Sequence, residues 1–586
     1  MVRGMSLRDS GTGGQGGENS SGAGAQGPWG TERGARGAPT LAADHKQIGL
    51  LYLWLALGAV FLGMLLSLTL RIGAFPGFAN SPERAGLLAV LHGSLMVFFV
   101  LTTAPQAGFG NYFLPLQIGA REMAFPAITI GAFWATVISL VGMISAFGVP
   151  LGVGLNLWIG SAALFCLAGL ANAINFSVTA IDLRGEGMTL PRLPLTAWAW
   201  LLNALLSFLI YSILLGSCLL LLSDRVAGTH FFAVFSSNLP SAVPGGAGYV
   251  PGSADDTAAL WQRLFWFFAQ AEVYVAMLPC FGIVTHLLAT FSRRPVWRER
   301  AVVLALCAVG LFGFCIWGEH MFASGLNPFS PLVFALLASS LGLPALILLA
   351  SWIGTLWKAS VQLSTAMLFA LGFVSLFISG GLSGLFLARH DLRAAAGSDD
   401  FITGHFHLVM GVAATFAILS ALFFWFPKLF GRRLNERLGK LHFWLTFAGV
   451  YCVFMPMHWL GLINHTEIYG VERVAAIQAW APALHSFIAV AALITVTSQV
   501  IFLANFALSL IAGEPAKECN PWRATTLEWS VPSPPPRDDF GAQTPTVYRG
   551  AYEFYPPGLL PQPAMDFVPQ HLTPEQAPAL TRREKN

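Results

Sequence analysis

Long apolar stretches recur through most of this chain and constrain its fold more than any other feature. A run of about 20 apolar residues can cross a bilayer as a helix, and a backbone in lipid must satisfy its own hydrogen bonds. Hydrophobic residues make up 55% of the 586 residues, and charged residues only 10%. We therefore predict an all-α, polytopic membrane protein with about twelve transmembrane helices, near 48–70, 87–114, 125–148, 155–180, 196–223, 262–291, 301–318, 329–356, 364–388, 402–428, 441–463 and 478–511.

The two ends of the chain differ in composition from this apolar middle. Residues 1–43 are rich in Gly, contain Ser and lack apolar periodicity, which predicts a disordered N-terminal tail. Residues 513–586 are rich in Pro and turn residues, which predicts an extended C-terminal segment over the cytoplasmic face. Between them, residues 44–512 form the predicted membrane domain.

The distribution of Arg and Lys predicts the orientation of the helices. Cations concentrate in alternate loops, and the loops between those carry few, so the cation-rich side is expected to be cytoplasmic. We therefore expect both termini in the cytoplasm and a multi-pass protein of a bacterial-type inner (plasma) membrane. The net charge of +3 is too small to indicate a nucleic-acid partner. The cations on the cytoplasmic side are Arg121, Arg184, Arg192, Arg293, Arg294, Arg298, Arg300, Lys358, Lys428, Arg432, Arg433, Arg437 and Lys440.

Two histidines interrupt the tenth apolar stretch as His405-Phe406-His407. Residues i and i+2 of a helix are about 200° apart around its axis, so the two imidazoles leave on opposite sides. They cannot share one metal, but each can hold its own heme. Polar residues at bilayer depth are costly and usually functional. Hydrogen bonding to neighbouring helices is the structural alternative.

His92 is the natural partner for one of this pair. It lies deep in the second apolar stretch, and Gly93 beside it leaves room for a flat ring. A low-spin heme needs two axial histidines that face each other from different helices. The remaining histidine of the pair then ligates a second, high-spin heme with an open face, as O2 chemistry requires.

Motifs spread over most of the chain resemble subunit I of the heme–copper oxidase superfamily, the catalytic subunit of cytochrome c oxidase. The similarity runs from about Asp44 to about Gly558. The matching segments are 44–49 (Asp-His-Lys-Gln-Ile-Gly), 108–112 (Gly-Phe-Gly-Asn-Tyr), 115–116, 118–120, 123–126 (Met-Ala-Phe-Pro), 187–190, 272–274 (Glu-Val-Tyr), 281–283 and 526–534 (Thr-Leu-Glu-Trp-Ser-Val-Pro-Ser-Pro).

The resemblance implies a ligand set and partners. His92 and His407 correspond to the ligands of the low-spin heme, and His405 corresponds to the ligand of the high-spin heme. The cofactors expected from it are two hemes and a second metal. The expected partners are subunit II- and subunit III-like membrane proteins and an electron donor such as cytochrome c.

The chain departs from this family at the copper ion opposite the high-spin heme. The family holds copper on three histidines, one from a His-Pro-Glu-Val-Tyr segment and two from a His-His pair. Here these positions read Gln270, Glu319 and His320, so two of the three ligands are replaced. One imidazole with a carboxylate and an amide oxygen suits iron(II) or another hard divalent ion better than copper. The second metal is therefore open between copper, non-heme iron and none.

Tyr274 matches the family tyrosine that is cross-linked to a copper-ligating histidine. Because that histidine is Gln270 here, the cross-link cannot form. Tyr274 is then either a hydrogen donor near the site or a packing residue.

Proton delivery is altered as well. One family route depends on a lysine whose position is Leu348 here, so this route is expected to be lost. The other route begins at a carboxylate matched by Glu122, passes Asn111 and ends at a buried glutamate matched by Glu272. Thr129 replaces a further family asparagine on that route. The alternative is that Glu122 is an ordinary interfacial residue and Glu272 a protonated remnant.

Three hypotheses for function follow. The first is a cytochrome c oxidase-type terminal oxidase subunit that reduces O2, with Tyr274 and Glu272 near the chemistry and a degenerate copper site. The second is a nitric oxide reductase-like enzyme, in which Glu319 helps to hold a non-heme metal. The third is a non-catalytic heme protein that relays electrons or serves as a structural paralogue.

Overall fold

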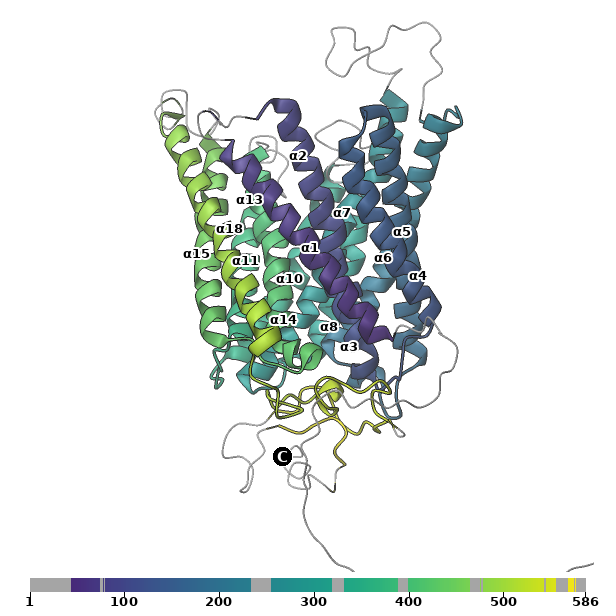
Figure 1. The fold of residues 1–586 in the computed structure, drawn as a ribbon, viewed down its shortest axis with the longest axis vertical. Coiled ribbons are helices and arrows are strands. Elements are labelled where there is room, and N and C mark those ends of the chain that lie inside the picture. The colour runs from purple at the N-terminus through teal and green to yellow at the C-terminus, as the bar shows by residue number, and fades with distance from the viewer. Residues whose placement is uncertain are drawn as a thin grey trace, which may run out of the picture. The chain divides into compact units, whose positions relative to one another are not determined.

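The computed structural model describes residues 44–73, 77, 80–232, 255–318, 331–387, 399–463, 475, 478–541, 544–554, 567–573 and 575. These residues belong to a single compact unit, Ala43–Asn586. Most of them are helical, apart from the loops and the C-terminal segment (Figure 1). The elements are α1 (His45–Ile72), α2 (Pro82–Ser94), η1 (Leu95–Gly108), α3 (Phe109–Ile118), α4 (Pro126–Ser145), η2 (Ala146–Gly148), α5 (Leu151–Asp182), η3 (Leu190–Arg192), α6 (Leu195–Val226), α7 (Asp255–Ser292), α8 (Glu299–Cys315), α9 (Pro331–Ser340), α10 (Gly342–Leu356), α11 (Thr365–Leu387), α13 (Asp399–Phe406), η5 (His407–Gly411), α14 (Val412–Phe430), α15 (Glu436–Ile463), α18 (Ala481–Ala512) and η6 (Leu527–Trp529).

The prediction of a polytopic, all-α membrane protein is confirmed. Within the described ranges, eleven helical spans are long and apolar enough to cross a membrane. The twelfth predicted span, near 301–318, corresponds to α8, whose 17 residues are at the lower end of the length range of membrane-spanning helices.

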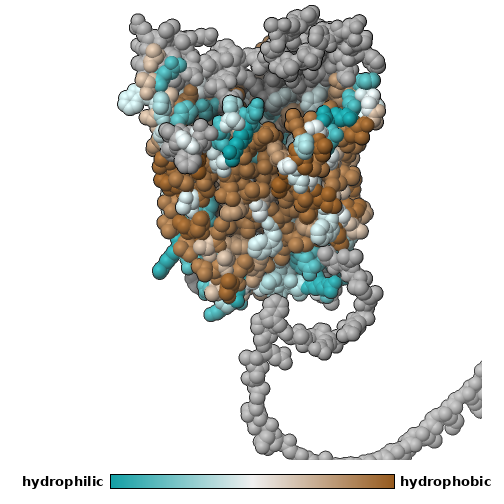
Figure 2. All heavy atoms as spheres, turned by 45° about the horizontal axis from the view of Figure 1, so that its top comes forward, coloured by the Kyte–Doolittle hydropathy of each residue, from teal (hydrophilic) through white to brown (hydrophobic). Residues whose placement is uncertain are grey.

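An apolar surface surrounds the helices. On α4, Trp134, Ile138 and Val141 recur at helical spacing and are 55%, 59% and 58% exposed, as expected for a face turned to lipid. Figure 2 shows the apolar belt, with hydrophilic residues at its two ends. The core centres on α7, which packs against η1, α6, α8, α10, α11 and α14. The span of α7 is 89% buried, so it has almost no contact with lipid.

Two helices contain π-helical segments close to the predicted site. The second span runs from α2 into η1 and then α3, and η1 contains Pro105, which has no N–H to donate. The hydroxyls of Thr102 and Thr103 bond to the carbonyls of Val97 and Phe98, five residues earlier. The second π-helical segment, η5, begins at His407. Such segments often mark functional sites.

The C-terminal segment crosses one end of the helices (Figure 1). Its Asp539 is buried and takes part in an ion-pair cluster at the start of α1: His45 Nε2 lies 2.9 Å from Asp539 Oδ2, and Lys46 Nζ contacts Asp539 Oδ1. Arg192 and Arg293, from the loops after α5 and α7, donate to backbone carbonyls of the same segment. The start of α1, two cation-rich loops and the C-terminal segment therefore share one face.

Candidate functional site

His92 and His407 face each other between two helices. His92 lies in the last turn of α2, and His407 is the first residue of η5. Their ring centroids are 6.4 Å apart, and the ring planes are within 14° of parallel. The two rings are thus nearly parallel, and a gap separates their centroids.

Both rings are held through the same nitrogen. His92 Nδ1 lies 2.8 Å from the carbonyl oxygen of Gly63 on α1, and His407 Nδ1 lies 2.8 Å from that of Thr403. Because a carbonyl can only accept, Nδ1 carries the proton in both rings. The lone pair of each neutral imidazole is then on Nε2, as in histidines that ligate metals.

The spacing of the pair fits one metal ion between the rings. Bonds of about 2 Å from a first-row metal to each Nε2 put the centroids of two axial imidazoles about 6 Å apart. The observed 6.4 Å agrees with this geometry. Phe454 on α15 stacks on the outer face of the His407 ring at 4.6 Å and 12°, which fixes the orientation of that ring.

His405 belongs to a different set of contacts. Its Nδ1 lies 3.1 Å from the carbonyl oxygen of Gly380 and 3.0 Å from Ser383 Oγ, both on α11. A Cβ on Gly384 would lie 3.1 Å from His405 Cε1, so this glycine admits the ring. His405 is thus held against α11, whereas His407 pairs with α2.

Arg71 is a site residue that the sequence analysis missed. It lies at the end of α1, and its Nη2 is 3.1 Å from Met457 Sδ. Its positive charge acts on both rings of the pair and interacts with Asp400. The sequence feature that could have identified Arg71 is its position as a lone cation at the end of an apolar span.

The second-metal positions are only partly described. Gln270 is buried on α7, with 8% of its surface exposed. Glu319 and His320 lie outside the described residues. Tyr274 packs tightly against α8, because a Cβ on Gly313 would come within 2.3 Å of Tyr274 Cδ2. Within the described ranges, no group of three or more His, Cys, Asp or Glu side chains is placed to hold a metal.

The residues predicted for proton delivery occupy different depths. Glu122 is exposed in the loop after α3, whereas Asn111 on α3 and Glu272 on α7 are buried. Asn111 Nδ2 donates to the Ala107 carbonyl at 2.7 Å, and Glu272 Oε1 lies 2.5 Å from Thr102 Oγ1. The structure therefore does not bring these three residues together in one contact.

A cavity of about 40 Å³, lined in part by polar side chains, lies beside hydrogen-bond partners of both buried residues. Its lining includes Ala107, whose carbonyl accepts from Asn111, and Thr102, which contacts Glu272. This volume is enough for one or a few water molecules. Its other polar lining residues are Tyr52, Thr103, Gln106, Thr136, Asn172, Asn203, Ser207 and Tyr211.

Leu348 lies in closely packed apolar surroundings. It is fully buried on α10, four residues before Trp352, whose ring packs against Phe281 at 6.2 Å and Phe377 at 5.8 Å. The indole Nε1 of Trp352 donates to Thr285 Oγ1 at 2.8 Å. No titratable side chain replaces the family lysine at position 348.

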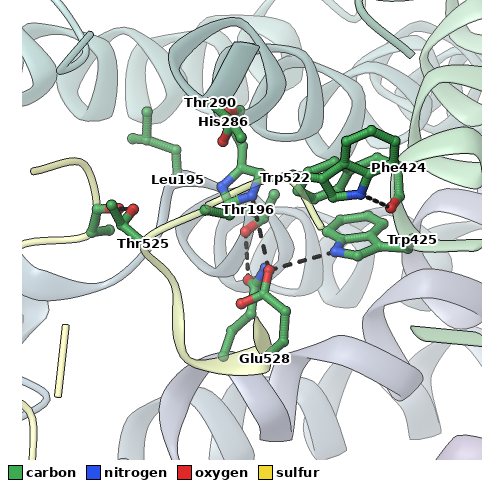
Figure 3. A network of polar contacts seen from close by, with 12 residues as sticks. Leu195, Thr196, His286, Thr290, Phe424, Trp425, Trp522, Thr525 and Glu528 are labelled. Carbon is green, nitrogen blue, oxygen red and sulfur yellow. Dashed lines mark hydrogen bonds and ion pairs between the residues drawn. The ribbon is translucent and has the colours of Figure 1, made fainter. Parts of the chain in front are cut away.

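A buried polar network joins the C-terminal segment to the helices. Figure 3 shows Glu528 directed toward His286 and Trp425. Glu528 Oε1 accepts from Gln117 Nε2 at 3.0 Å and lies 3.9 Å from His286 Nε2. Burial raises the pKa of the Glu528 carboxyl. The sequence analysis noted the motif around Glu528 but not this set of contacts.

The fold defines a polytopic helical membrane protein, and the parallel rings of His92 and His407 lie between its helices. The family model described as Cytochrome C and Quinol oxidase polypeptide I matches residues 47–497. The chain belongs to this family, the subunit I family of the heme–copper oxidases. Members of the family use heme and copper, and their subunit I works with a subunit II and a cytochrome c donor.

Individual relatives cover nearly the full length. The chain is 38% identical over 559 residues to alternative cytochrome c oxidase subunit 1 of Bradyrhizobium diazoefficiens, covering 91% of this chain and 92% of the relative. It is 35% identical to cytochrome c oxidase subunit 1 of Synechocystis, covering 88% and 92%. A heme–copper terminal oxidase dimer solved by cryo-EM shares the fold, with a TM-score of 0.63, 16% identity and coverage of 80% and 84%.

Proposed function

We propose that this chain is the subunit I-like component of a respiratory terminal oxidase of the cytochrome c oxidase type. Electrons pass through a low-spin heme held by His92 and His407 to a high-spin heme held by His405, where O2 is reduced. Bound hemes supply one-electron chemistry, and O2 binding where one axial position is open. The copper site opposite His405 is degenerate.

One observation carries the proposal: the parallel His92 and His407 rings, 6.4 Å apart. The chain itself contributes three further things. The carbonyls of Gly63 and Thr403 fix the tautomer of the pair, and Phe454 fixes one ring. Arg71 adds a positive charge beside both rings, which favours electron arrival.

Proton delivery in this proposal runs from Glu122 past Asn111 to Glu272. The cavity lined by Ala107, which accepts from Asn111, and by Thr102, which contacts Glu272, supports it, because a proton can move through hydroxyls, amides and water but not through apolar packing. The packing around Leu348 and Trp352 supports the loss of the lysine route.

The replaced copper ligands favour two other candidates, and metal analysis separates all three. In the oxidase, optical spectra of the purified complex show two hemes, and CO binds to one of them. One additional iron per chain together with NO reduction would favour the reductase with Glu319 as a ligand. Two hemes without CO or NO binding would leave only the electron-relay role.

The partners and location follow the same proposal. We expect subunit II- and subunit III-like membrane proteins beside this chain, and cytochrome c or a similar donor. The start of α1, the cation-rich loops and the C-terminal segment share one face, which the positive-inside rule assigns to the cytoplasm of a bacterial-type inner membrane. Labelling of engineered cysteines at Lys517 and Arg71 from the two sides of sealed vesicles tests this orientation.

A further inference from the structure

Two buried oxygen atoms have no hydrogen-bond partner of good geometry among the described residues. They are the Tyr211 hydroxyl on α6 and Glu272 Oε2 on α7. The two residues are 2% and 3% exposed. Tyr211 interacts with both Glu272 and Thr102. A buried polar atom left unpaired is costly, so this arrangement needs an explanation.

The Thr102 hydroxyl indicates how the Glu272 carboxyl is bonded. Thr102 Oγ1 lies 2.8 Å from the Val97 carbonyl oxygen and 2.5 Å from Glu272 Oε1. A hydroxyl has one proton, and a carbonyl can only accept it. When Thr102 donates to Val97, the short contact to Glu272 requires a proton on Glu272 Oε1. Glu272 Oε2 is then a carbonyl-type oxygen that needs a donor.

The structure holds Tyr211 where it can be that donor. The ring packs edge-on against Phe165 at 5.9 Å and lies 6.1 Å from Phe268. A Cβ on Gly169 of α5 would lie 2.5 Å from Tyr211 Cδ2, so the glycine provides the space for this ring. Tyr211 and Thr102 both line the 40 Å³ polar cavity, which has room for a bridging water.

We propose that Tyr211 is a positioning residue for the proton on Glu272. Its hydroxyl donates to Glu272 Oε2, directly or through one water in the cavity, while the protonated Glu272 Oε1 donates to Thr102. The carboxyl is thereby held at the inner end of the cavity. The role in catalysis rests on the proposed function, because Glu272 ends the proton route there; the hydrogen bond itself does not depend on it.

Infrared spectroscopy of the full chain in lipid tests the hydrogen bond without heme or turnover. The difference spectrum between wild type and Glu272→Gln isolates the carboxyl C=O stretch of protonated Glu272. Tyr211→Phe should move this band to higher frequency, because the carbonyl oxygen loses its donor. Gly169→Ala, which pushes the Tyr211 ring aside, should move the band in the same direction. It provides a second test if the Tyr211→Phe variant does not accumulate.

Tyr52→Phe is the matched control. Tyr52 lines the same cavity, but its hydroxyl accepts from Asn172 at 3.2 Å, so its removal should leave the band in place. An unshifted band in Tyr211→Phe overturns the proposal. So does an equal shift in Tyr52→Phe, or the absence of any protonated Glu272 band in wild type. Loss of heme spectra with an intact band shift would count against the proposed function alone.

Discussion

The imidazoles of His92 and His407 lie 6.4 Å apart and within 14° of parallel, although they come from the second and the tenth predicted spans. The His92 ring is anchored through Nδ1 to the Gly63 carbonyl on α1, whereas the His407 ring is anchored to Thr403, four residues earlier in its own span. The gap between the rings therefore depends on the packing of distant helices as well as on one local contact.

Replacing His407 tests the paired site. His407→Ala removes one of two axial imidazoles, and we expect loss of one of the two hemes per chain together with its low-spin spectrum. His442→Gln is the control, because His442 is buried on α15 but bonds to Gln499 at 2.8 Å. Heme content and optical spectra of the purified proteins are the measurements. An unchanged low-spin spectrum in His407→Ala would refute the assignment.

The close approach of Gly384 to His405 gives a second test. Gly384→Val should displace His405, with an overpacking cost of about 1–3 kcal/mol. We expect a changed high-spin heme signal and CO binding while the low-spin signal stays as in wild type. Gly381→Ala is the control, because a Cβ there meets no atom within 4 Å. Equal loss of both signals in Gly384→Val would point to general misfolding instead of a local effect.

The buried Glu528 predicts a pH dependence of the C-terminal segment. An unfolded Glu has a pKa of about 4.3, and burial raises the pKa of Glu528 in the folded chain. The folded state therefore holds its proton to higher pH than the unfolded state does. The docking of the segment should lose stability as pH rises from about 4.3 through the raised pKa.

Glu528→Gln should remove this part of the pH dependence, since an amide does not ionise. Hydrogen exchange of peptides within 525–541 measures the docking, with each variant compared with wild type at the same pH. Glu553→Gln is the control, because Glu553 is partly exposed and pairs with Arg549. A pH profile of Glu528→Gln that matches wild type would show that another group controls the docking.

Restoring the two replaced copper ligands is a fourth test. The double variant Gln270→His with Glu319→His should raise bound copper from well below one toward one ion per chain, if the pocket keeps the family geometry. Elemental analysis measures the copper, and the two single variants are the controls. No gain in the double variant would mean that the pocket no longer has the shape of a copper site.

The sequence predicted the spans because apolar length is a local property. The eleven candidate spans within the described residues and the family follow from such runs and from short motifs, and the structure places the His92 ring near that of His407. The end of α8 at Cys315 was not predicted, because hydropathy does not mark the residue at which a helix ends.

The missed residues depend on contacts between distant segments. Nothing local to Tyr211 or Thr102 points to Glu272, since each is one polar residue in an apolar helix. Arg71 looked like an ordinary loop cation, and Glu528 gained its partners only when the C-terminal segment docked. The heme roles of His92, His405 and His407 and the proton roles of Glu122, Asn111 and Glu272 stay predictions until they are measured.

The π-helical segment η1 determines which deletions this chain can tolerate. It lies directly after His92 and contains Thr102, and it holds more residues per turn than an α-helix does. Removing one residue between them would rewind the segment and rotate His92 by about 100° relative to Thr102. The angular positions of His92 and Thr102 around the helix axis are thus coupled, and so are the histidine pair and the contact with Glu272. Substitutions elsewhere in this segment keep both contacts, whereas a change in its length disrupts one of the two.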